Sequence, residues 1–373
     1  MSFKNGMNPD AKRFGHGTKF ISVMDILNNQ YIYYDNIRAS VELQDDDIDT
    51  YGVNYGDILF QRSSETLEDV GQANVYLDSK PAIFGGFVIR GKSKGNYNPL
   101  FFRHLLVSPT ARKRIIMKGA GAQHFNIGQD GLSKVSLDIP CMQEQKKIGK
   151  LLQCIDARIA TQNKIIEDLK KLKSAISKQV FAQKPNGWNR LDTLFSKGKA
   201  GGTPTSTNKE YYNGVIPFLS INDITKQGKY VRYTENHLSQ SGLENSSAWV
   251  VPVYSLIMSM YASVGLVTIN EIPITTSQAM FAMQLKDKDL LDYLYYYLSY
   301  FKYRHIHKYL ETGTQSNINA DIVRGIMIPT YGYNRNMEIA STLQGIDAKI
   351  DNELSVLELF NRQKSYLLSQ MFI

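Results

Sequence analysis

One eight-residue phrase occurs twice in this chain, and it constrains the fold more than any other feature. Residues 152–159 read LQCIDARI, and residues 343–350 read LQGIDAKI, 191 positions later. Matches at the same offset extend without a gap over residues 143–181, from Ile148 and Ile339 to Phe181 and Phe372. Because self-similarity at a fixed offset indicates a duplicated unit, the two segments should share one length and one geometry.

Apolar residues in both segments recur at alternating spacings of three and four, which indicates a coiled-coil seam about five heptads long. Neither segment contains proline. A helix of 39 residues would be about 58 Å long, and a helix with one apolar stripe needs a partner. We expect the two helices to pack through Ile148, Leu152, Ile155, Ile159, Ile166, Leu169, Leu343, Ile346, Ile350, Leu357 and Phe360. The repeated aspartates, Asp156 and Asp347, are expected to serve helix packing or subunit docking.

The connections between segments predict the topology. The linker AQKPNG (182–187) ends the first helix, so the second globular segment starts at its far end. The second helix leaves that segment near Asn334 and can run back along the first. The expected fold is α+β, with two globular α/β domains held apart by two long antiparallel coiled-coil helices in pseudo-two-fold symmetry. The expected domain boundaries are 1–140, 141–183, 184–332 and 333–373.

The globular segments repeat more faintly, at an offset of 198. FISVMDI (20–26) matches FLSINDI (218–224), and YGDILFQR (55–62) matches VYSLIMSM (253–260). A Gly-x-Gln turn and a short strand to proline precede each long helix, at 121–140 and 313–329. Matching scaffolds with different loops would let two equivalent modules recognise different things.

Composition favours an anionic partner. The formal net charge is +8, and lysines and arginines lie in both globular segments, which favours nucleic acid. A basic surface without a ligand is the equal alternative on charge alone. The chain has only two cysteines and a polar N-terminus. The uncharged stretch at 250–269 is interpreted as buried strands and not as a membrane span. These features predict a soluble, cytoplasmic protein.

Catalytic and metal signatures are weak. Gly119-Ala120-Gly121 follows a basic helical run and not a strand, unlike a phosphate-binding loop. His305 and His307 are two apart, on different faces of a helix, and no cysteine cluster completes a zinc site. We therefore expect no active site, metal or cofactor in this chain.

An ordered set of motifs resembles the DNA-specificity subunit of type I restriction–modification systems. The second half contains GGTPTSTNKEYYNG (201–214), IPFLSINDI (216–224), SLIMSMYASVG (255–265), TTSQAMF (275–281) and TGTQSNIN (312–319). The first half contains KFISVMDI (19–26), GDILFQRSSE (56–65) and QEQKKIGKLLQCIDARI (143–159). The opening with Trp188 and GGTP has no counterpart before Phe20, so either the first domain is of a variant class or the chain begins late.

The resemblance implies a non-catalytic subunit with two target-recognition domains, each reading one half of a bipartite, asymmetric site in double-stranded DNA. The helix pair would set the spacer and dock two methyltransferase subunits, which bind S-adenosylmethionine, and a motor-nuclease subunit would complete the restriction complex. The loops it marks for DNA contact are Gln61, Arg62, Ser63, Ser64, Gln123 and His124 in the first domain, and Tyr261, Thr276, Ser277, Gln278, Gln315, Ser316 and Asn317 in the second.

Three alternatives remain open at this point. The Gly-x-Gln turns could brace each domain against its helix instead of meeting DNA. The whole chain could be a scaffold whose coiled coil joins two protein-binding modules. It could also be a self-contained DNA methyltransferase or nuclease.

Overall fold

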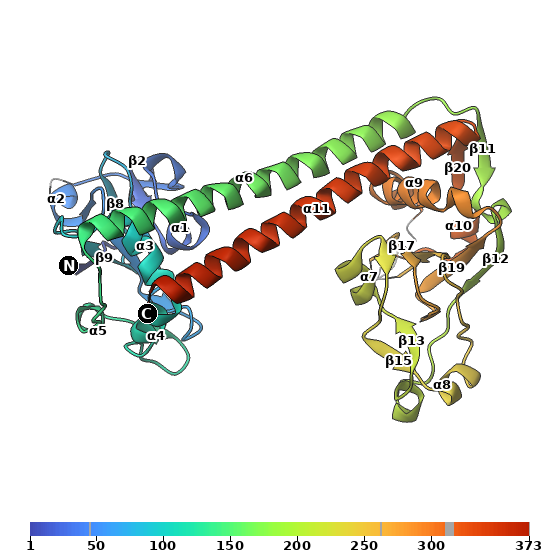
Figure 1. Ribbon diagram of the computed structural model, residues 1–373, viewed down its shortest axis with the longest axis horizontal. Coiled ribbons are helices and arrows are strands. Elements are labelled where there is room, and N and C mark those ends of the chain that lie inside the picture. Colours follow the sequence, from blue (N-terminus) through green and yellow to red (C-terminus); the bar gives the residue numbers. More distant parts are fainter. Residues whose placement is uncertain (45, 262, 310–316, 373) are drawn as a thin grey trace. The chain divides into compact units, whose positions relative to one another are not determined.

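The computed structural model describes residues 1–44, 46–261, 263–309 and 317–372. The chain divides into two compact units (Figure 1). Unit 1 comprises Met1–Ile165 and Glu353–Ile373, and unit 2 comprises Ile166–Asn352. Each unit therefore contains one globular part and one half of each long helix, and the fold is α+β.

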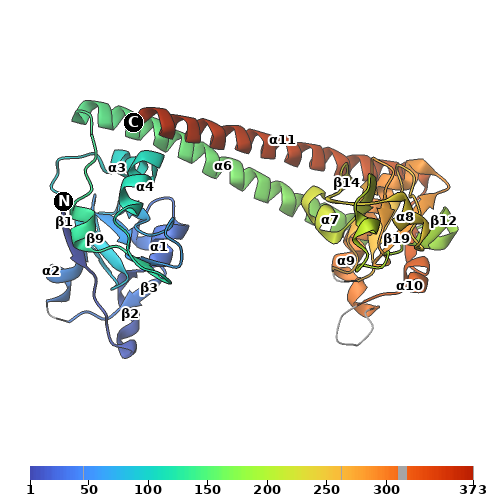
Figure 2. The ribbon, with the colours of Figure 1, turned by 90° about the horizontal axis from the view of Figure 1, so that it is seen from below.

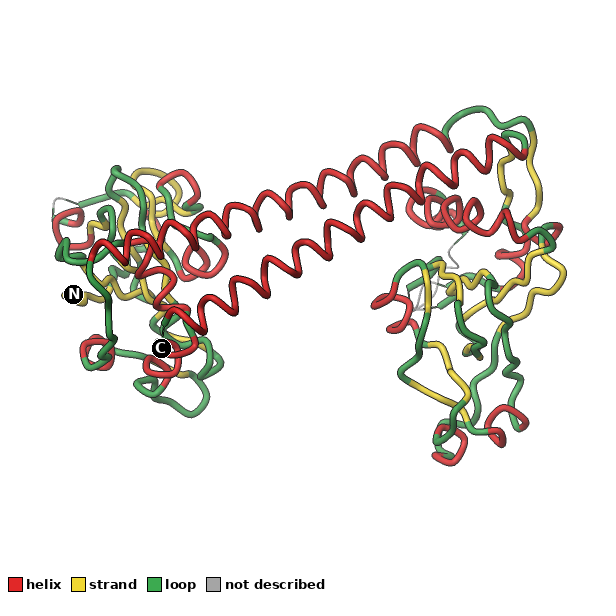
Figure 3. The backbone as a smooth tube through the Cα atoms, in the orientation of Figure 1, coloured by secondary structure: helices red, strands yellow, loops and turns green. Residues whose placement is uncertain are grey.

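The two long helices expected from the repeat are present. They are α6 (Met142–Phe181) and α11 (Tyr333–Met371), of 40 and 39 residues. Figure 3 shows both as uninterrupted coils. Within unit 1 Asp156 meets Lys364 and Gln162 meets Glu353, so the two helices run antiparallel there.

The globular part of unit 1 is built on two four-stranded sheets among the described residues. One has the order β1 (Ser2–Asn5), β9 (Val88–Lys92), β5 (Ile58–Gln61), β7 (Ala73–Val75). The other has the order β3 (Ala39–Val41), β2 (Phe14–Ile21), β8 (Ala82–Phe84), β4 (Gly52–Val53). A short ribbon pairs β6 (Ser63–Ser64) with β10 (Phe125–Asn126). The helices are α1 (Val23–Asn28), α2 (Asp47–Tyr51), α3 (Pro99–Val107), α4 (Pro109–Ile116) and α5 (Gln129–Ser133).

The described residues of unit 2 form three sheets. The largest has the order β12 (Phe195–Ala200), β19 (Met280–Leu285), β16 (Leu256–Ser259), β17 (Val267–Asn270), β14 (Tyr230–Val231). The others are β15 (Asn236–Leu238), β13 (Ile216–Leu219), β18 (Thr275–Thr276), and the pair β11 (Gly187–Arg190) with β20 (Met327–Thr330). The helices are α7 (Ile221–Gln227), α8 (Gln240–Glu244), α9 (Leu291–Arg304) and α10 (Ala320–Arg324).

The uncharged stretch at 250–269 forms the buried strands β16 and β17, as the sequence predicts. Every residue of both strands is buried, as expected for strands inside a sheet that is covered on both faces. Among the helices of the described residues, none combines the length and apolarity that crossing a bilayer requires.

The faint 198-residue repeat corresponds to one shared scaffold. In unit 1 Ile21 of β2 pairs in parallel with Phe84 of β8, and in unit 2 Leu219 of β13 pairs in parallel with Thr276 of β18. The next residues, S-x-x-D in both copies, form the first turn of α1 and of α7. The Asp25 carboxylate accepts the Ser22 N–H at 2.8 Å, and Asp223 accepts that of Ser220 at 2.8 Å. These buried aspartates therefore cap a helix, which explains why the motif recurs.

One helix of each globular part lies against the long helices. In unit 1 this is α3, beside the start of α6 in both views (Figures 1 and 2). The backbone N–H of Asn98, at the N-terminus of α3, donates to Gln145 Oε1 of α6 at 2.9 Å. Gly149 of α6 permits this approach, because a Cβ there would lie 2.9 Å from the Phe101 nitrogen. In unit 2 the corresponding helix is α9.

Candidate functional site

The aspartate of the repeated phrase forms a buried polar contact in unit 1. Asp156 accepts from Lys364 Nζ at 2.6 Å and from Tyr31 Oη at 2.9 Å, and His104 Nε2 lies 3.5 Å away. Burial alone would raise the pKa of Asp156, but the hydrogen bond and charge of Lys364 hold it below its ordinary value. The carboxylate thus connects α11, α3 and the segment at Tyr31.

Unit 2 contains the same contact built from the repeat counterparts. Asp347 of α11 pairs with Lys173 Nζ of α6 at 2.5 Å and accepts from Tyr296 Oη of α9 at 2.8 Å. Lys173 and Lys364 are equivalent positions of the repeat, as are Asp156 and Asp347. Each aspartate therefore binds a lysine of the other long helix and a tyrosine of the globular part in its unit. No catalytic role is needed to explain its recurrence.

A third polar contact joins residues that are each other's repeat counterparts. Gln162 Nε2 donates to the backbone oxygen and the carboxylate of Glu353, 191 positions away. Both residues are buried, at 7% and 8% exposure. In an isologous interface a residue meets its own counterpart at the symmetry axis. This contact is what a duplicated helix packed on its copy would produce.

The predicted seam residues all lie at least half-buried. Leu152, Ile155, Ile166, Leu343 and Ile350 are buried, and the half-buried ones are Ile148, Ile159, Leu169, Ile346, Leu357 and Phe360. Part of this stripe faces a globular core, since Leu152 and Ile155 cluster with residues of α3 such as Phe101 and Leu105. The stripe therefore serves two neighbours, the other helix and the globular part.

The predicted DNA-contact segments of unit 1 come together. The ribbon pairs Ser64 with Phe125 and Ser63 with Asn126, so Gln123 and His124 immediately precede the strand beside Ser63–Ser64. Gln123 and His124 are exposed, and Arg62, Ser63 and Ser64 are half-buried. Gln61 is different: it is 6% exposed, and its Nε2 donates to the Ser63 backbone oxygen at 2.8 Å. Gln61 is placed to brace this cluster.

In unit 2 three predicted segments meet around Met260. The Met260 N–H donates to the Ala279 oxygen at 2.7 Å, and its own oxygen accepts from Ile318 N at 3.0 Å. This places Tyr261 next to the segments that carry Ser277–Gln278 and Asn317. Tyr261 is 39% exposed, whereas Thr276 in β18 is fully buried at 0%. Gln315 and Ser316 lie outside the described residues.

The backbone pattern around Met260 recurs around Arg62 and identifies a loop that the sequence did not suggest. Arg62 N–H donates to the Phe87 oxygen at 2.9 Å, and the Arg62 oxygen accepts from Ile127 N at 2.9 Å. Gly85–Phe87 therefore occupies in unit 1 the place of Ser277–Ala279 in unit 2. Phe87 is 68% exposed and Arg62 Nη1 donates to the Gly86 oxygen at 3.3 Å. No sequence identity signals this equivalence, which rests on the strand pairing before each loop.

Across the described residues, no group of three or more His, Cys, Asp or Glu side chains converges in a way that could hold a metal ion. The polar side chains at the two loop clusters are instead hydrogen-bonding groups suited to base edges and phosphates. Such clusters can recognise a ligand through hydrogen bonds.

Comparisons with known proteins agree with this arrangement. A protein-family model described as "Type I restriction modification DNA specificity domain" matches twice, over residues 3–171 and 185–358. A putative type I restriction enzyme MjaX specificity subunit of Methanocaldococcus jannaschii is 24% identical over 354 residues, which are 88% of this chain and 80% of the relative. The HindI specificity subunit of Haemophilus influenzae is 32% identical over 113 residues, 30% of this chain and 24% of the relative.

Two solved structures share the fold. The S subunit of a type I restriction–modification system from M. genitalium has a TM-score of 0.57 at 15% identity, covering 100% of this chain and 93% of the other. A chain from a study of complex assembly and conformational transition of the type I R-M system has a TM-score of 0.58 at 15% identity, covering 99% and 97%.

Proposed function

Because this chain belongs to the type I restriction–modification DNA specificity family, we propose that it chooses the DNA site at which the other subunits of such a complex act. It is a non-catalytic DNA-recognition subunit. Its partners are double-stranded DNA and the methyltransferase and restriction subunits. We expect two methyltransferase subunits, which carry S-adenosylmethionine, and motor-nuclease subunits that complete the assembly.

Each unit reads one half of a bipartite, asymmetric site. The observation that carries this proposal is the shared backbone pattern around Arg62 and Met260, on which the two units present different side chains. A common frame would hold each cluster in the same way on its half-site. Different side chains at equivalent positions would then select different bases, since sequence is read at base edges while phosphate contacts fix position.

The exposed and half-buried members of the two clusters are the proposed contact residues. They are Arg62, Ser63, Ser64, Gln123 and His124 in unit 1, and Tyr261, Ser277, Gln278 and Asn317 in unit 2. The buried Gln61 and Thr276 are assigned a bracing role instead. Arg suits guanine, Gln and Asn suit adenine, and Ser suits either base edges or phosphate.

The helix pair serves as the spacer and as the docking surface for the methyltransferase subunits. Three apolar side chains of α6 support a docking surface, because they are exposed on a helix whose other large apolar side chains are at least half-buried. These are Leu151 at 44%, Ile165 at 39% and Leu172 at 48% exposure. The division into domains at residues 140, 183 and 332 remains a prediction.

Methylation mapping tests the proposal directly. DNA from cells that express this chain with its cognate methyltransferase should carry methyl groups at one motif, made of two unlike half-sites separated by an unread spacer. Cells that express the methyltransferase alone are the control and should lack the motif. A single continuous motif, or methylation independent of this chain, would contradict the proposal.

A further inference from the structure

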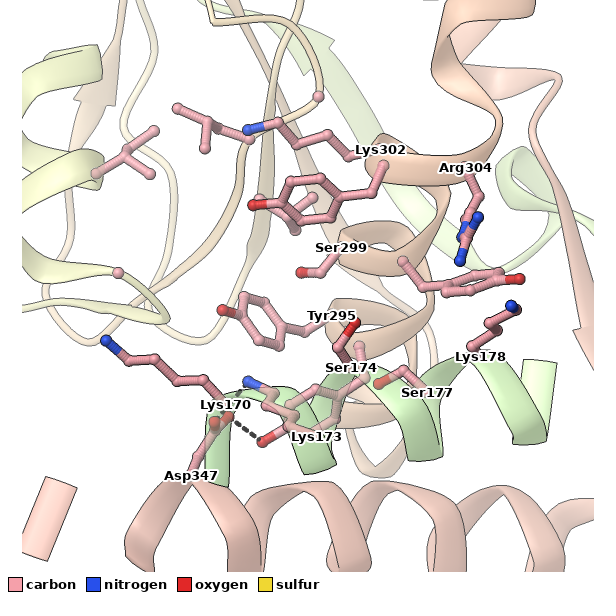
Figure 4. Close-up of a pocket in the computed structure, with 18 of the residues that line it drawn as sticks. Lys170, Lys173, Ser174, Ser177, Lys178, Tyr295, Ser299, Lys302, Arg304 and Asp347 are labelled. Atoms are coloured by element: carbon pink, nitrogen blue, oxygen red, sulfur yellow. Dashed lines mark hydrogen bonds and ion pairs between the residues drawn. The ribbon is translucent and has the colours of Figure 1, made fainter. Parts of the chain in front are cut away.

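Unit 2 contains a cavity of about 540 Å³ between α6, α9 and the turn at Gly265–Val267. Figure 4 shows the hydroxyls of Ser174, Ser177 and Ser299 between the two helices, with basic side chains around them. A cavity of this volume is large enough for a drug-sized ligand. The contact of Lys173, Asp347 and Tyr296 forms one part of its lining. Apart from the seam residue Ile350, the remaining lining residues have no role in the contacts described above.

Four cations that line this cavity have no carboxylate partner among the described residues. They are Lys170 and Lys178 of α6, and Lys302 and Arg304 of α9. In the described part of the chain none of the four forms an ion pair, whereas Lys173 beside them is paired with Asp347. Burial lowers the pKa of Lys302, as expected for an ammonium group whose charge has no counterion. The carboxylate of Asp347 also lines the cavity, but it is paired with Lys173, so within the described residues these four cations are left without a counterion.

Hydroxyl groups and aromatic rings complete the lining. Ser174, Ser177 and Ser299 provide neutral donors, and Tyr295, Tyr300 and Tyr303 provide the walls. Lys and Arg with nearby hydroxyls are the groups that hold phosphate oxygens. Tyrosine rings offer faces on which bases or sugars can stack. Together these groups fit a phosphate ester that carries a ring.

The repeat shows that these cations are not required for helix pairing. Lys170 corresponds to Asn361 and Lys178 to Ser369 in α11, while Ser177 corresponds to Leu368. The paired lysine, by contrast, is retained as Lys173 and Lys364, each bound to the opposite aspartate. The duplicated helix keeps its structural contacts in both copies and has the cavity cations in only one.

The cavity also adjoins the proposed recognition segment of unit 2. Gly265 and Leu266 line it. They close the hairpin that carries Tyr261, since Gly265 N–H donates to the Ser259 oxygen at 2.9 Å. A strand that leaves a base contact at Tyr261 would pass next to this basic lining.

We infer that this cavity binds phosphate esters, and that their source is the DNA backbone beside the half-site read by unit 2. The inference rests on the proposed function for its ligand. The contact holds backbone and reads no base, so it contributes affinity without sequence preference. Unit 1 lacks these cations at the equivalent helix positions. The DNA backbone beside its half-site therefore receives fewer phosphate contacts than the backbone beside the half-site of unit 2.

The salt dependence of DNA binding tests this inference. The full chain, assembled with its methyltransferase, would be titrated with duplex DNA at several KCl concentrations. The double variants K302Q/R304Q and K170Q/K178Q should each flatten the slope of log affinity against log salt by about 0.9 for each phosphate that the variant no longer neutralises. The motif and the preference for it over unrelated DNA should stay unchanged. The matched control K164Q, an exposed lysine of α6 outside the cavity, should keep the wild-type slope.

Other outcomes are decisive as well. The phosphate ester could instead come from a free nucleotide. Titration with a deoxynucleoside monophosphate, followed by tyrosine fluorescence, tests this source. Binding to the wild type but not to K302Q/R304Q, with unchanged salt slopes, supports the phosphate site with a free nucleotide as its ligand. Unchanged slopes without nucleotide binding overturn the inference. The inference is also overturned if the variants fail only to assemble with the methyltransferase, because the cavity lining would then be a protein-binding surface. A wild type without any preferred DNA site would instead refute the proposed function.

Discussion

Lowering the pH from 6.5 to 4 should destabilise unit 1 more than unit 2, because His104 is buried there as a neutral imidazole, whereas His305 of unit 2, whose pKa burial also lowers, is only half-buried. His104 is 1% exposed, and burial lowers its pKa to about 4. The nearby Asp156 carboxylate favours the protonated form, while the charges of Lys364 and Arg103 oppose it. Burial therefore determines the charge state at neutral pH.

The size of the effect follows from proton linkage. An unfolded histidine takes up its proton near pH 6.5, roughly the unperturbed value. The folded one does so only near its pKa of about 4. Between these values the unfolded state binds more protons, so stability falls as the pH falls. At about 1.4 kcal/mol for each pH unit between the two pKa values, the loss reaches about 3 kcal/mol by pH 4.

Hydrogen exchange read by mass spectrometry can measure this loss separately in each unit. Protection of the α3 amides should fall between pH 6.5 and 4, after correction for intrinsic exchange rates. The α9 amides of unit 2 are the comparison, because Tyr296 contacts the repeated aspartate, Asp347, from that helix; their response should be smaller, since His305 at its C-terminus is only half-buried. His104→Gln should remove the excess pH dependence of α3. An equal pH response in His104→Gln and the wild type would refute the reasoning.

Three further predictions concern the long helices. Gly345→Ala should raise the free energy of unfolding by about 1 kcal/mol, since a Cβ there meets nothing within 4 Å. Gly149→Ala should lower the free energy of unfolding, because its Cβ would clash with α3. Thermal unfolding measures the sign of both changes. Asp347→Asn should destabilise unit 2 by about 1–3 kcal/mol, because Lys173 loses its charged partner; urea unfolding followed by the fluorescence of Trp188 and Trp249, both in unit 2, measures this. Deleting one heptad from each of α6 and α11 shortens them by about 10 Å, so the unread spacer should shrink by about three base pairs; a spacer unchanged on methylation mapping would contradict the ruler role.

The helices could be predicted because their repeat is long, ungapped and periodic. The 191-residue offset makes Asp156 equivalent to Asp347, and Lys173 equivalent to Lys364. Because the helices run antiparallel, each aspartate pairs with the lysine of the other helix: Asp156 with Lys364, and Asp347 with Lys173. The periodicity was less informative at Leu172, which fits the heptad pattern but is 48% exposed. A heptad pattern identifies apolar positions without stating which neighbour covers each one.

The recognition loops could be predicted only in part. Gln61 and Thr276 are polar residues in recognition motifs, yet both are buried, because Gln61 ends the core strand β5 and Thr276 ends the buried strand β18. The loop at Gly85–Phe87 could not be predicted, because Gly-Gly-Phe shares no residue with Ser-Gln-Ala of the other unit. The cavity of unit 2 depends on side chains from α6 and α9, about 130 residues apart in the sequence. Such long-range convergence leaves no local pattern.

The central claim is that each unit reads its own half of the site, and exchanging one unit's globular part tests it most directly. Residues 188–331 would be replaced by the matching segment of a relative with a different motif, with α6 and α11 left intact. Methylation mapping should then show one half-site changed, and the other half-site retained. A change in both half-sites, or in neither, would contradict the claim.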